Sequence, residues 1–427
     1  MDVNKLIDSN PWWLTKKVLE ELMGIRREAY ELLIKSVTIK EVTIITGVRR
    51  SGKSTIMYQM IDALLKNGVA PEQILFINLE DNRLANDSLD EIYSAYKERI
   101  NPGKKAYVFL DEIQRKEKWE LWIRRHYDLK SDCKFIISGS CSYLLKKEYS
   151  TLLTGRNLTF DVFPLSFQEF LSFKNIALDL NSLKKGLILE KEKHMVVNAF
   201  GDYLYYGGFP DITLKEKEFK TKVLAQYFDD LLYKDIVDRH NLNSQKTKDL
   251  ALYLITNFTG VLSLRTLRAV LGLSYESISD YMSYYKEAFL FFSAEHFAYS
   301  MKEQKTNPSK IYCIDNGLRN AVSFKFSKDE GKLAENLVFI ELKRREQDAY
   351  YWKGKQEVDF IIKYSNQSIE AINVSYSDEI PEREISGLFE FKELFKKTKK
   401  LTIITKDTEK TEHGITYIPL WKWMLLE

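Results

Sequence analysis

Short apolar runs alternate with amphipathic stretches along the first 162 residues, and this alternation predicts strands and helices in turn. The apolar runs are rich in β-branched and aromatic residues, and they cover 42–45, 74–79, 107–110 and 134–137. The segment Ile56–Lys66 is periodic and contains no glycine, so it predicts a helix after the first run. Buried strands separated by helices are typical of a parallel sheet with helices on both faces. We therefore expect residues 36–162 to form a doubly wound α/β domain.

The rest of the chain predicts four further segments. The N-terminal lead-in contains a predicted helix over Thr15–Lys35, and Trp12 or Trp13 is expected to pack onto the α/β domain or to face a partner. Beyond the α/β domain the pattern turns helical, and a last segment mixes strands with helices. The expected divisions are a helical lead-in over 1–35, a helical lid over 163–245, a winged-helix-like domain over 246–300 and an α/β domain over 301–427.

The segment 262–292 resembles a winged-helix or helix-turn-helix unit. Gly272 fits the central turn, and Ser274 is suited to cap the second helix. That helix offers Glu276 and Asp280 on its exposed face, and acids are poorly suited to DNA phosphates. Two arginines on the preceding helix nevertheless keep DNA contact open. A DNA reader and a structural or protein-binding unit therefore remain as alternatives.

A phosphate-binding pattern, G-x-x-x-x-G-K-S, directly follows the first predicted strand. It consists of Gly47, Val48, Arg49, Arg50, Ser51, Gly52, Lys53 and Ser54, and Thr55 follows. Its glycines let successive backbone N–H groups turn toward phosphate oxygens, while the next helix presents its positive N-terminal end. Lys53 is expected to reach the β- and γ-phosphates, and Ser54 a Mg²⁺ ion. The pattern predicts ATP and Mg²⁺ as ligands, and no guanine-reading N-K-x-D element is evident.

Two adjacent carboxylates, Asp111 and Glu112, end the strand predicted over 107–110. Ligands bind at the carboxyl ends of parallel strands, so both acids are expected beside the phosphate-binding loop. We expect Asp111 to hold Mg²⁺ directly or through water, and Glu112 to polarise the attacking water. The alternative is that the two acids only end the strand and cap the next helix.

Small polar residues follow the strand predicted over 134–137. A hydroxyl at that position can bond the γ-phosphate or the attacking water, so Ser138 or Ser140 is a candidate sensor of hydrolysis. The alternative is an ordinary helix cap, for which Ser142 is suited.

Arg156 follows the predicted sensor segment and is a candidate γ-phosphate arginine. Such a residue neutralises charge in the transition state of phosphoryl transfer, within the chain or across a subunit boundary. An oligomer therefore stays open. The alternatives are a surface salt bridge for Arg156, or the same role for Arg49 or Arg50.

The amino-acid composition indicates where the protein is located but does not identify its partner. The chain has 427 residues, of which 44% are hydrophobic, and a formal net charge of +3, so it can bury several cores while its charge neither demands nor forbids nucleic acid. It has no bilayer-length apolar stretch and no signal-peptide core, which favours a cytoplasmic protein without membrane contact. Three cysteines and five histidines show no zinc-ligand spacing, so we expect neither a structural metal nor disulfides.

The order of elements from 301 onward resembles a PD-(D/E)xK nuclease fold. There Glu335, on a helix, and Asp359, on a strand, would bind Mg²⁺ together with the acid of an E-x-K strand. Two alignments of that third strand remain open. One places Asn373 and Ser375 where the acid and lysine belong, and the other restores an acid, Glu370, but no lysine. We therefore expect a degenerate, inactive nuclease-like domain.

Taken together, these motifs resemble the archaeal and bacterial AAA-type P-loop ATPases that carry a C-terminal nuclease-like domain. The resemblance covers nearly the whole chain and rests on segments 10–13, 47–55, 110–114, 138–140, 155–156, 164–167, 207–210 and 357–360. It implies a nucleoside triphosphatase with an α/β core, a helical lid, a winged helix and a restriction-endonuclease-like tail.

The function we expect is Mg²⁺-dependent ATP hydrolysis, used as a molecular switch or motor that repositions the C-terminal domains and acts on DNA or on a protein partner. Two alternatives from other classes remain. One is a non-enzymatic ATP-binding module that docks a protein, and the other is an ATP-driven DNA nuclease, which the missing lysine argues against.

Overall fold

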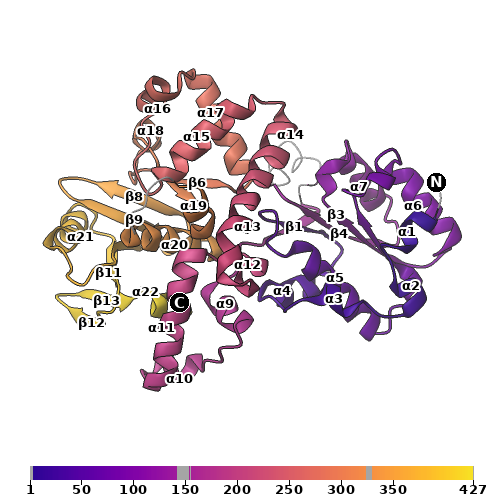
Figure 1. The fold of residues 1–427 in the computed structure, drawn as a ribbon, viewed down its shortest axis with the longest axis horizontal. Helices are drawn as coiled ribbons and strands as arrows, with labels where there is room; N and C mark the ends of the chain where they lie inside the picture. The colour runs from indigo at the N-terminus through magenta and orange to yellow at the C-terminus, as the bar shows by residue number, and fades with distance from the viewer. Residues whose placement is uncertain (1–2, 142–152, 154, 324–328, 427) are drawn as a thin grey trace. The chain divides into compact units, whose positions relative to one another are not determined.

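The computed structural model of the protein describes residues 3–141, 153, 155–323 and 329–426. The chain divides into two compact units (Figure 1). The first contains residues 1–163 and 287–289, and the second contains residues 164–286 and 290–427. Ser142, named above as an alternative helix cap, lies outside the described residues.

The first unit is built on a five-stranded sheet whose paired strands are all parallel. Its strands are β1 (Val42–Thr46), β2 (Ile74–Asn78), β3 (Ala106–Asp111), β4 (Cys133–Gly139) and β5 (Asn157–Asp161). Their order across the sheet is β2-β3-β4-β1-β5. The predicted parallel sheet is confirmed, and its carboxyl ends share one edge, where ligands of such sheets bind.

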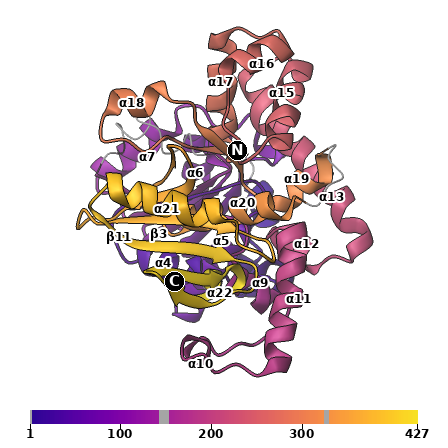
Figure 2. The same cartoon turned by 90° about the vertical axis from the view of Figure 1, so that its left-hand side faces the viewer.

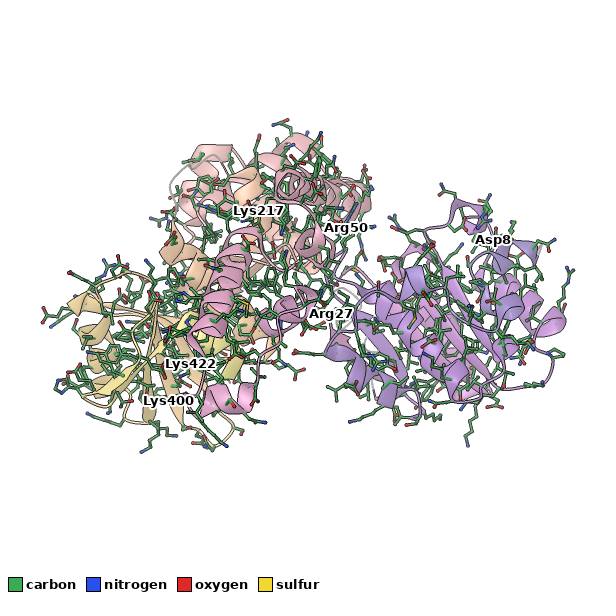
Figure 3. All side chains as sticks on the ribbon, turned by 60° about the horizontal axis from the view of Figure 1, so that its bottom comes forward. Asp8, Arg27, Arg50, Lys217, Lys400 and Lys422 are labelled. Carbon is green, nitrogen blue, oxygen red and sulfur yellow. The ribbon has the colours of Figure 1, made fainter. Side chains whose placement is uncertain are left out.

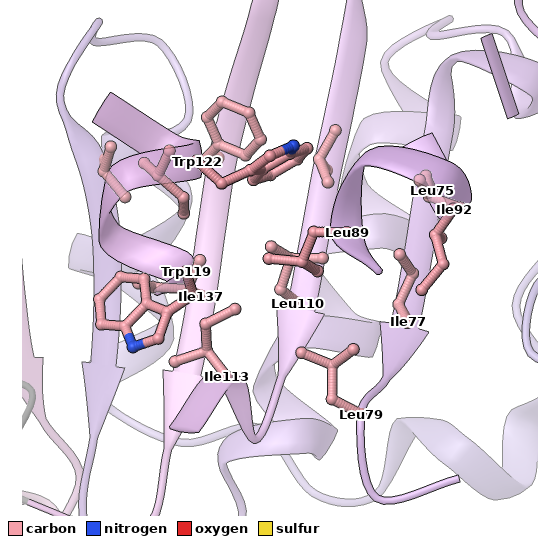
Figure 4. Packing of buried hydrophobic residues seen from close by; sticks show 14 of the residues in the cluster. Leu75, Ile77, Leu79, Leu89, Ile92, Leu110, Ile113, Trp119, Trp122 and Ile137 are labelled. Atoms are coloured by element: carbon pink, nitrogen blue, oxygen red, sulfur yellow. The ribbon is translucent and has the colours of Figure 1, made fainter. Parts of the chain in front are cut away.

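Alternate residues of these strands pack on opposite faces of the sheet, as the pleat requires. One face, with Leu110 and Ile137, is covered by α6 (Leu89–Arg99) and α7 (Trp119–Asp128), as Figure 4 shows. The other face, with Phe109 among its residues, is covered by α4 (Ala29–Ser36) and α5 (Lys53–Lys66). The strands are therefore buried on both sides, which explains their continuous apolar runs.

The helical stretch expected over Thr15–Lys35 is not one continuous helix. The lead-in instead holds short helices, α1 (Asn4–Ile7), α2 (Trp12–Thr15), α3 (Glu20–Met23) and α4. Lys16 has a left-handed backbone with φ +61°, and Gly24 has φ +48°, so the helical geometry is interrupted twice. The expected packing of the tryptophans is confirmed, since the indoles of Trp12 and Trp13 donate hydrogen bonds to the carbonyl of Ile74 at 3.2 and 2.8 Å.

The second unit begins with helices, as its pattern predicts. They are α9 (Phe167–Phe173), α10 (Leu180–Lys184), α11 (Glu190–Tyr206), α12 (Pro210–Leu214), α13 (Lys217–Asp230), a π-helical segment (Leu231–Val237), α14 (Asp238–His240) and α15 (Ser244–Thr256). The helical character expected over 163–245 is present in these elements.

A helix-turn-helix follows, formed by α16 (Leu264–Leu271) and α17 (Tyr275–Glu287). Gly272 has φ +63° at the turn, and the Ser274 hydroxyl accepts a hydrogen bond from the Ser277 backbone at 3.1 Å, so the expected turn and cap are confirmed. The antiparallel pair β6 (Phe291–Ala294) and β7 (Lys310–Cys313) comes next, with α18 (Met301–Thr306) between the two strands. Its assignment as a winged helix stays a prediction.

The unit ends in a six-stranded mixed sheet of order β12-β13-β11-β10-β9-β8. Its strands are β8 (Ala349–Lys353), β9 (Glu357–Lys363), β10 (Ile369–Ser375), β11 (Thr398–Thr405), β12 (Lys410–Glu412) and β13 (Ile415–Pro419). The helices beside it are α19 (Asn316–Val322), α20 (Glu330–Arg344), α21 (Glu382–Leu394) and α22 (Leu420–Leu426). Helix α21 lies along one face of the sheet (Figure 2), and its Leu388 and Phe391 belong to the core on that face.

Candidate nucleotide-binding site

The loop between β1 and α5 folds back on itself because three of its residues have positive φ. These are Gly47 at +148°, Arg50 at +67° and Gly52 at +97°. A Cβ atom at Gly47 would lie 2.1 Å from the carbonyl oxygen of Val162, so only glycine fits there. Left-handed turns of this kind direct successive backbone N–H groups into one concavity, which suits an anion.

Lys53 begins α5 and is only 4% exposed. Its ammonium donates hydrogen bonds to the carbonyl oxygens of Gly47 at 2.9 Å and Val48 at 3.0 Å. Both acceptors are neutral. The nearby Ser51 hydroxyl is buried and has no hydrogen-bond partner among the described residues. A buried cation and an unsatisfied hydroxyl within one loop fit a phosphate group.

A hydroxyl–carboxylate chain lies beside this loop at the carboxyl ends of β3 and β4. The Ser54 hydroxyl donates to Asp111 Oδ2 at 2.6 Å, and the Ser138 hydroxyl donates to Asp111 Oδ1. Burial raises the pKa of the Asp111 carboxyl, and the charge of Glu112 raises it further. Hydroxyl and carboxylate oxygens are ligands that Mg²⁺ prefers, so this donor set fits the expected ion.

Glu112 follows Asp111 with a left-handed backbone of φ +55°, which is uncommon for a residue with a side chain and is a form of strain found at functional sites. Its backbone N–H donates to the Ser138 hydroxyl at 3.3 Å. The amide of Gln114 donates to the Glu112 carboxylate and to the Ser140 hydroxyl, the latter at 3.1 Å. Ser138 therefore contacts the acid pair directly, and Ser140 is linked to Glu112 through Gln114. The role of Gln114 was missed from sequence, although it lies two residues after Glu112.

A second ionic cluster joins the loop to the end of β2. Arg49 binds both oxygens of Glu80, at 3.2 and 2.9 Å, and Arg115 binds Glu80 at 2.7 Å. The hydrogen bond from Arg49 lowers the pKa of Glu80 to about 2, against the effect of partial burial. Sequence reasoning offered Arg49 for phosphate contact but did not anticipate this carboxylate.

Arg27 supports the loop from the N-terminal lead-in (Figure 3). Its guanidinium donates to the carbonyl oxygens of Ser51 at 2.6 Å and Phe163 at 3.0 Å, and the residue is buried. No motif marks this residue, and only the fold brings it to the loop.

Arg156 lies away from this edge of the sheet. Its carbonyl accepts a hydrogen bond from Val42, the first residue of β1, whereas the loop follows the last residue, Thr46. A strand rises roughly 3.3 Å per residue, so the length of β1 separates them. The guanidinium instead pairs with Asp128 at 3.0 Å. The structure therefore does not bring Arg156 to the loop of its own chain. A role as γ-phosphate arginine would require Arg156 to act on the site of a neighbouring subunit, and that role stays a prediction.

The acids singled out in the C-terminal domain separate into two groups. Asn373 accepts a hydrogen bond from the backbone of Asp359 at 3.0 Å, which places it beside that acid. Glu370 instead accepts from Thr402 at 2.8 Å and pairs with Lys400 at 3.1 Å. Of the two alignments, the structure thus favours the one in which Asn373, and not an acid, lies next to Asp359. Among the described residues, no group of three or more His, Cys, Asp or Glu is arranged to hold a metal ion.

The helix-turn-helix region borders a cavity of about 630 Å³, and its wall includes Arg265, Lys286 and Lys305. Arg268, the other arginine of α16, lies with its guanidinium 5.2 Å from the ring of Tyr275. These cations are compatible with contact to a DNA backbone, and that contact stays a prediction.

Three segments of the chain match models of known protein families. Residues 39–171 match the family described as AAA domain, residues 197–329 the domain of unknown function DUF8612, and residues 330–423 the domain of unknown function DUF4143. The first match agrees with the parallel sheet and loop, so the chain contains an AAA-type P-loop ATPase domain. The match to DUF4143 does not identify the C-terminal segment as nuclease-like.

Two relatives align over nearly their whole length. The uncharacterized protein MJ1544 of Methanocaldococcus jannaschii is 34% identical over 99% of this chain and 97% of its own length. An uncharacterized protein of Haemophilus influenzae is 30% identical over 94% of this chain and 98% of its own length. Among solved structures, the Walker-type ATPase PABY2304 of Pyrococcus abyssi is 14% identical with a TM-score of 0.48, over 72% of this chain and 97% of that one. In the described part of the chain, no helix is long and apolar enough to span a bilayer.

Proposed function

The chain belongs to the family of the uncharacterized protein MJ1544 of Methanocaldococcus jannaschii, and we propose that it binds and hydrolyses ATP with Mg²⁺ in its AAA domain. The observation that carries this proposal is the hydrogen-bonded chain from Ser54 through Asp111 to Ser138, next to a loop whose lysine is held by neutral carbonyls. Binding groups for phosphate and metal thus meet at one edge of the sheet.

Each group has a distinct task in this proposal. The loop N–H groups and Lys53 bind the phosphates, because the ammonium can exchange its two carbonyl acceptors for phosphate oxygens. Ser54 and Asp111 hold Mg²⁺, which when bound neutralises charge on the phosphate oxygens. Glu112 orients the attacking water and accepts its proton.

Gln114, Ser138 and Ser140 form the proposed link from hydrolysis to the rest of the chain. Ser138 contacts both the Asp111 carboxylate and the Glu112 backbone, and Gln114 joins the Glu112 carboxylate to Ser140. A change of charge at the γ-phosphate position alters what these hydroxyls bond. We infer that the ATPase works as a switch or motor for a DNA or protein partner of its C-terminal domains.

Steady-state ATP hydrolysis by the wild type and by Glu112→Gln tests the proposal. We expect the substitution to lower turnover by about 10² to 10⁴ while ATP binding persists, because a general base contributes in that range. Glu117→Gln makes the same chemical change at an exposed position nearby and serves as the matched control. Unchanged turnover in Glu112→Gln would remove this residue from the role.

The same assay with and without duplex DNA, at two salt concentrations, separates the partners. Turnover raised by DNA in a salt-sensitive way supports a DNA-linked ATPase, since phosphate contacts weaken as salt rises. Turnover that is indifferent to DNA points to a protein partner. ATP binding without turnover under any condition would contradict hydrolysis and favour a non-enzymatic ATP-binding module.

A further inference from the structure

A polar pocket of about 500 Å³ in the second unit gathers carboxylates from three elements. Glu335 comes from α20, Glu357 and Asp359 come from the start of β9, and Glu384 comes from α21. The first three of these acids lie around one point. The side chains of Glu335 and Asp359 are only 13% and 15% exposed. Three carboxylates around one point repel each other when little water screens them, so such a group needs a positive charge among its members.

Lys310, from β7, supplies that charge. Its ammonium lies 3.0 Å from Glu335, 2.6 Å from Glu357 and 3.1 Å from Asp359, and the lysine is 2% exposed. An ammonium has three N–H donors, and here three carboxylates surround it. The distances are those of charge-assisted hydrogen bonds, whereas Mg²⁺ holds its oxygen ligands at about 2.0–2.1 Å. The carboxylates are therefore spaced for the lysine and do not fit a divalent ion beside it.

The surrounding structure fixes Lys310 in this position. Asn336 of α20 accepts from the backbone N–H of Cys313 and donates to its carbonyl, both at 2.8 Å, which ties the end of β7 to the helix. Tyr312 stacks on Phe339 with ring centroids 4.0 Å apart, and its hydroxyl donates to Glu335 at 2.9 Å. The strand cannot move away from α20 without breaking these contacts.

The lysine stays charged. Burial lowers the pKa of Lys310, but the charges of Glu335 and Asp359 outweigh it and raise the pKa well above its usual value. One ammonium does not fully compensate three acids, and burial raises the pKa of Glu335 to about 7 although Lys310 lowers it.

We propose that Lys310 is the resident cation of this pocket and takes the place that a divalent metal ion would need to occupy among Glu335, Glu357 and Asp359. The C-terminal domain then requires no metal ion for its structure. It also lacks the metal site that cleavage by a nuclease-like domain would need. This inference concerns the second unit and does not depend on ATP hydrolysis.

Mn²⁺ binding to the full-length, nucleotide-free protein tests the proposal. Binding is measured by Mn²⁺ electron paramagnetic resonance on the wild type and on Lys310→Met. This substitution keeps a long, unbranched side chain but removes its charge. We expect Lys310→Met to bind Mn²⁺ at least about tenfold more tightly than the wild type, because freed carboxylates suit a divalent ion. Adding Asp359→Asn to the variant should abolish the gain, and Mn²⁺ should raise the melting temperature of Lys310→Met by more than that of the wild type.

Lys353→Met is the matched control, because it removes an exposed ammonium 3.7 Å from the same Glu357 and should create no new binding. If Lys310→Met fails to fold, Lys310→Gln takes its place, since it keeps hydrogen-bond donors without the charge. A folded Lys310 variant that gains no Mn²⁺ affinity would overturn the proposal. So would a wild-type protein that already binds Mn²⁺ and loses it on Asp359→Asn.

Discussion

Lys53 and Lys310 are both buried lysines, at 4% and 2% exposure, and both lie near carboxylates, but their hydrogen-bond acceptors differ. Lys53 donates to two backbone carbonyls, which are neutral, whereas Lys310 is surrounded by three carboxylates. An ammonium can leave a neutral carbonyl for a phosphate at little electrostatic cost. If it left a buried carboxylate, the charge of that carboxylate would lose its partner, which is costly. The charge of the acceptors, rather than burial, thus distinguishes a ligand-binding lysine from a structural one.

The acids of the two sites differ in the same sense. Asp111 accepts hydrogen bonds from two hydroxyls, Ser54 and Ser138, which carry no charge and can turn toward another ligand. Asp359 contacts the ammonium of Lys310 and accepts a backbone hydrogen bond from Val374 at 2.9 Å, and neither partner can rotate away. The first site is therefore built to exchange partners, and the second is built to keep them.

Unfolding should separate the two lysines most strongly. We expect Lys310→Met to lower the free energy of unfolding by about 3–5 kcal/mol, because breaking a buried ion pair leaves uncompensated charge. Lys53→Met should lower it by only about 1–3 kcal/mol, since it leaves two neutral carbonyls unsatisfied but removes no hydrogen bond from a carboxylate. Urea unfolding of both variants measures the difference. Equal losses would contradict the comparison.

ATP turnover should order the two lysines the other way. We expect Lys53→Met to reduce turnover by about 10² to 10³, since a preorganised group that stabilises transition-state charge contributes in that range. Lys310→Met, measured per folded molecule, should leave turnover near that of the wild type. Single-turnover and steady-state assays on both variants provide the check, and a matching loss in Lys310→Met would show that the second unit takes part in hydrolysis.

Local patterns predicted which residues of the first site lie together. The loop over 47–55 and the Asp111–Glu112 pair are contiguous in sequence, and their strands are marked by apolar runs that the sheet buries on both faces. The same reasoning anticipated that residues 301–427 mix strands with helices.

What the sequence did not reveal depends on contacts between distant segments. Glu80 meets Arg49 across 31 residues, and Lys310 meets Asp359 across 49 residues. Neither pair belongs to a local motif. The pattern of apolar and polar residues does not show which strand end lies beside which helix. The position of Arg156 was hidden from sequence for a related reason, because its nearness to the sensor strand in sequence does not show that β5 starts beside the first residue of β1.

Asp315 extends the comparison to a buried acid whose hydrogen-bond donors are backbone N–H groups. It accepts backbone hydrogen bonds from Gly208 at 2.7 Å and Gly317 at 2.8 Å, and burial raises its pKa from 3.8 to about 6. The folded protein therefore holds this proton more tightly than the unfolded chain. The stability it contributes is present below about pH 4 and is lost as the pH rises through about 6.

The measurement is the unfolding free energy of the wild type and of Asp315→Asn between pH 4 and 6.5. The wild-type value, relative to the variant, should fall by about 2 kcal/mol over this range, since each pKa unit corresponds to about 1.4 kcal/mol and the range covers most of the titration. The variant removes the titration of this group and leaves other acids in place. A difference that stays constant with pH would show that Asp315 is ionised in the folded protein throughout.

Arg156 should show the smallest effect within a single chain. Its guanidinium is 30% exposed and pairs with Asp128, which is 43% exposed, so Arg156→Ala should lower the free energy of unfolding by less than about 1 kcal/mol. Because Arg156 lies at the end of β1 opposite the loop, turnover at low protein concentration should not change. Comparing wild-type and Arg156→Ala turnover over a range of protein concentrations distinguishes the two remaining interpretations. A deficit that grows with concentration would assign Arg156 to the active site of a neighbouring subunit, and equal turnover throughout would leave it as a surface salt bridge.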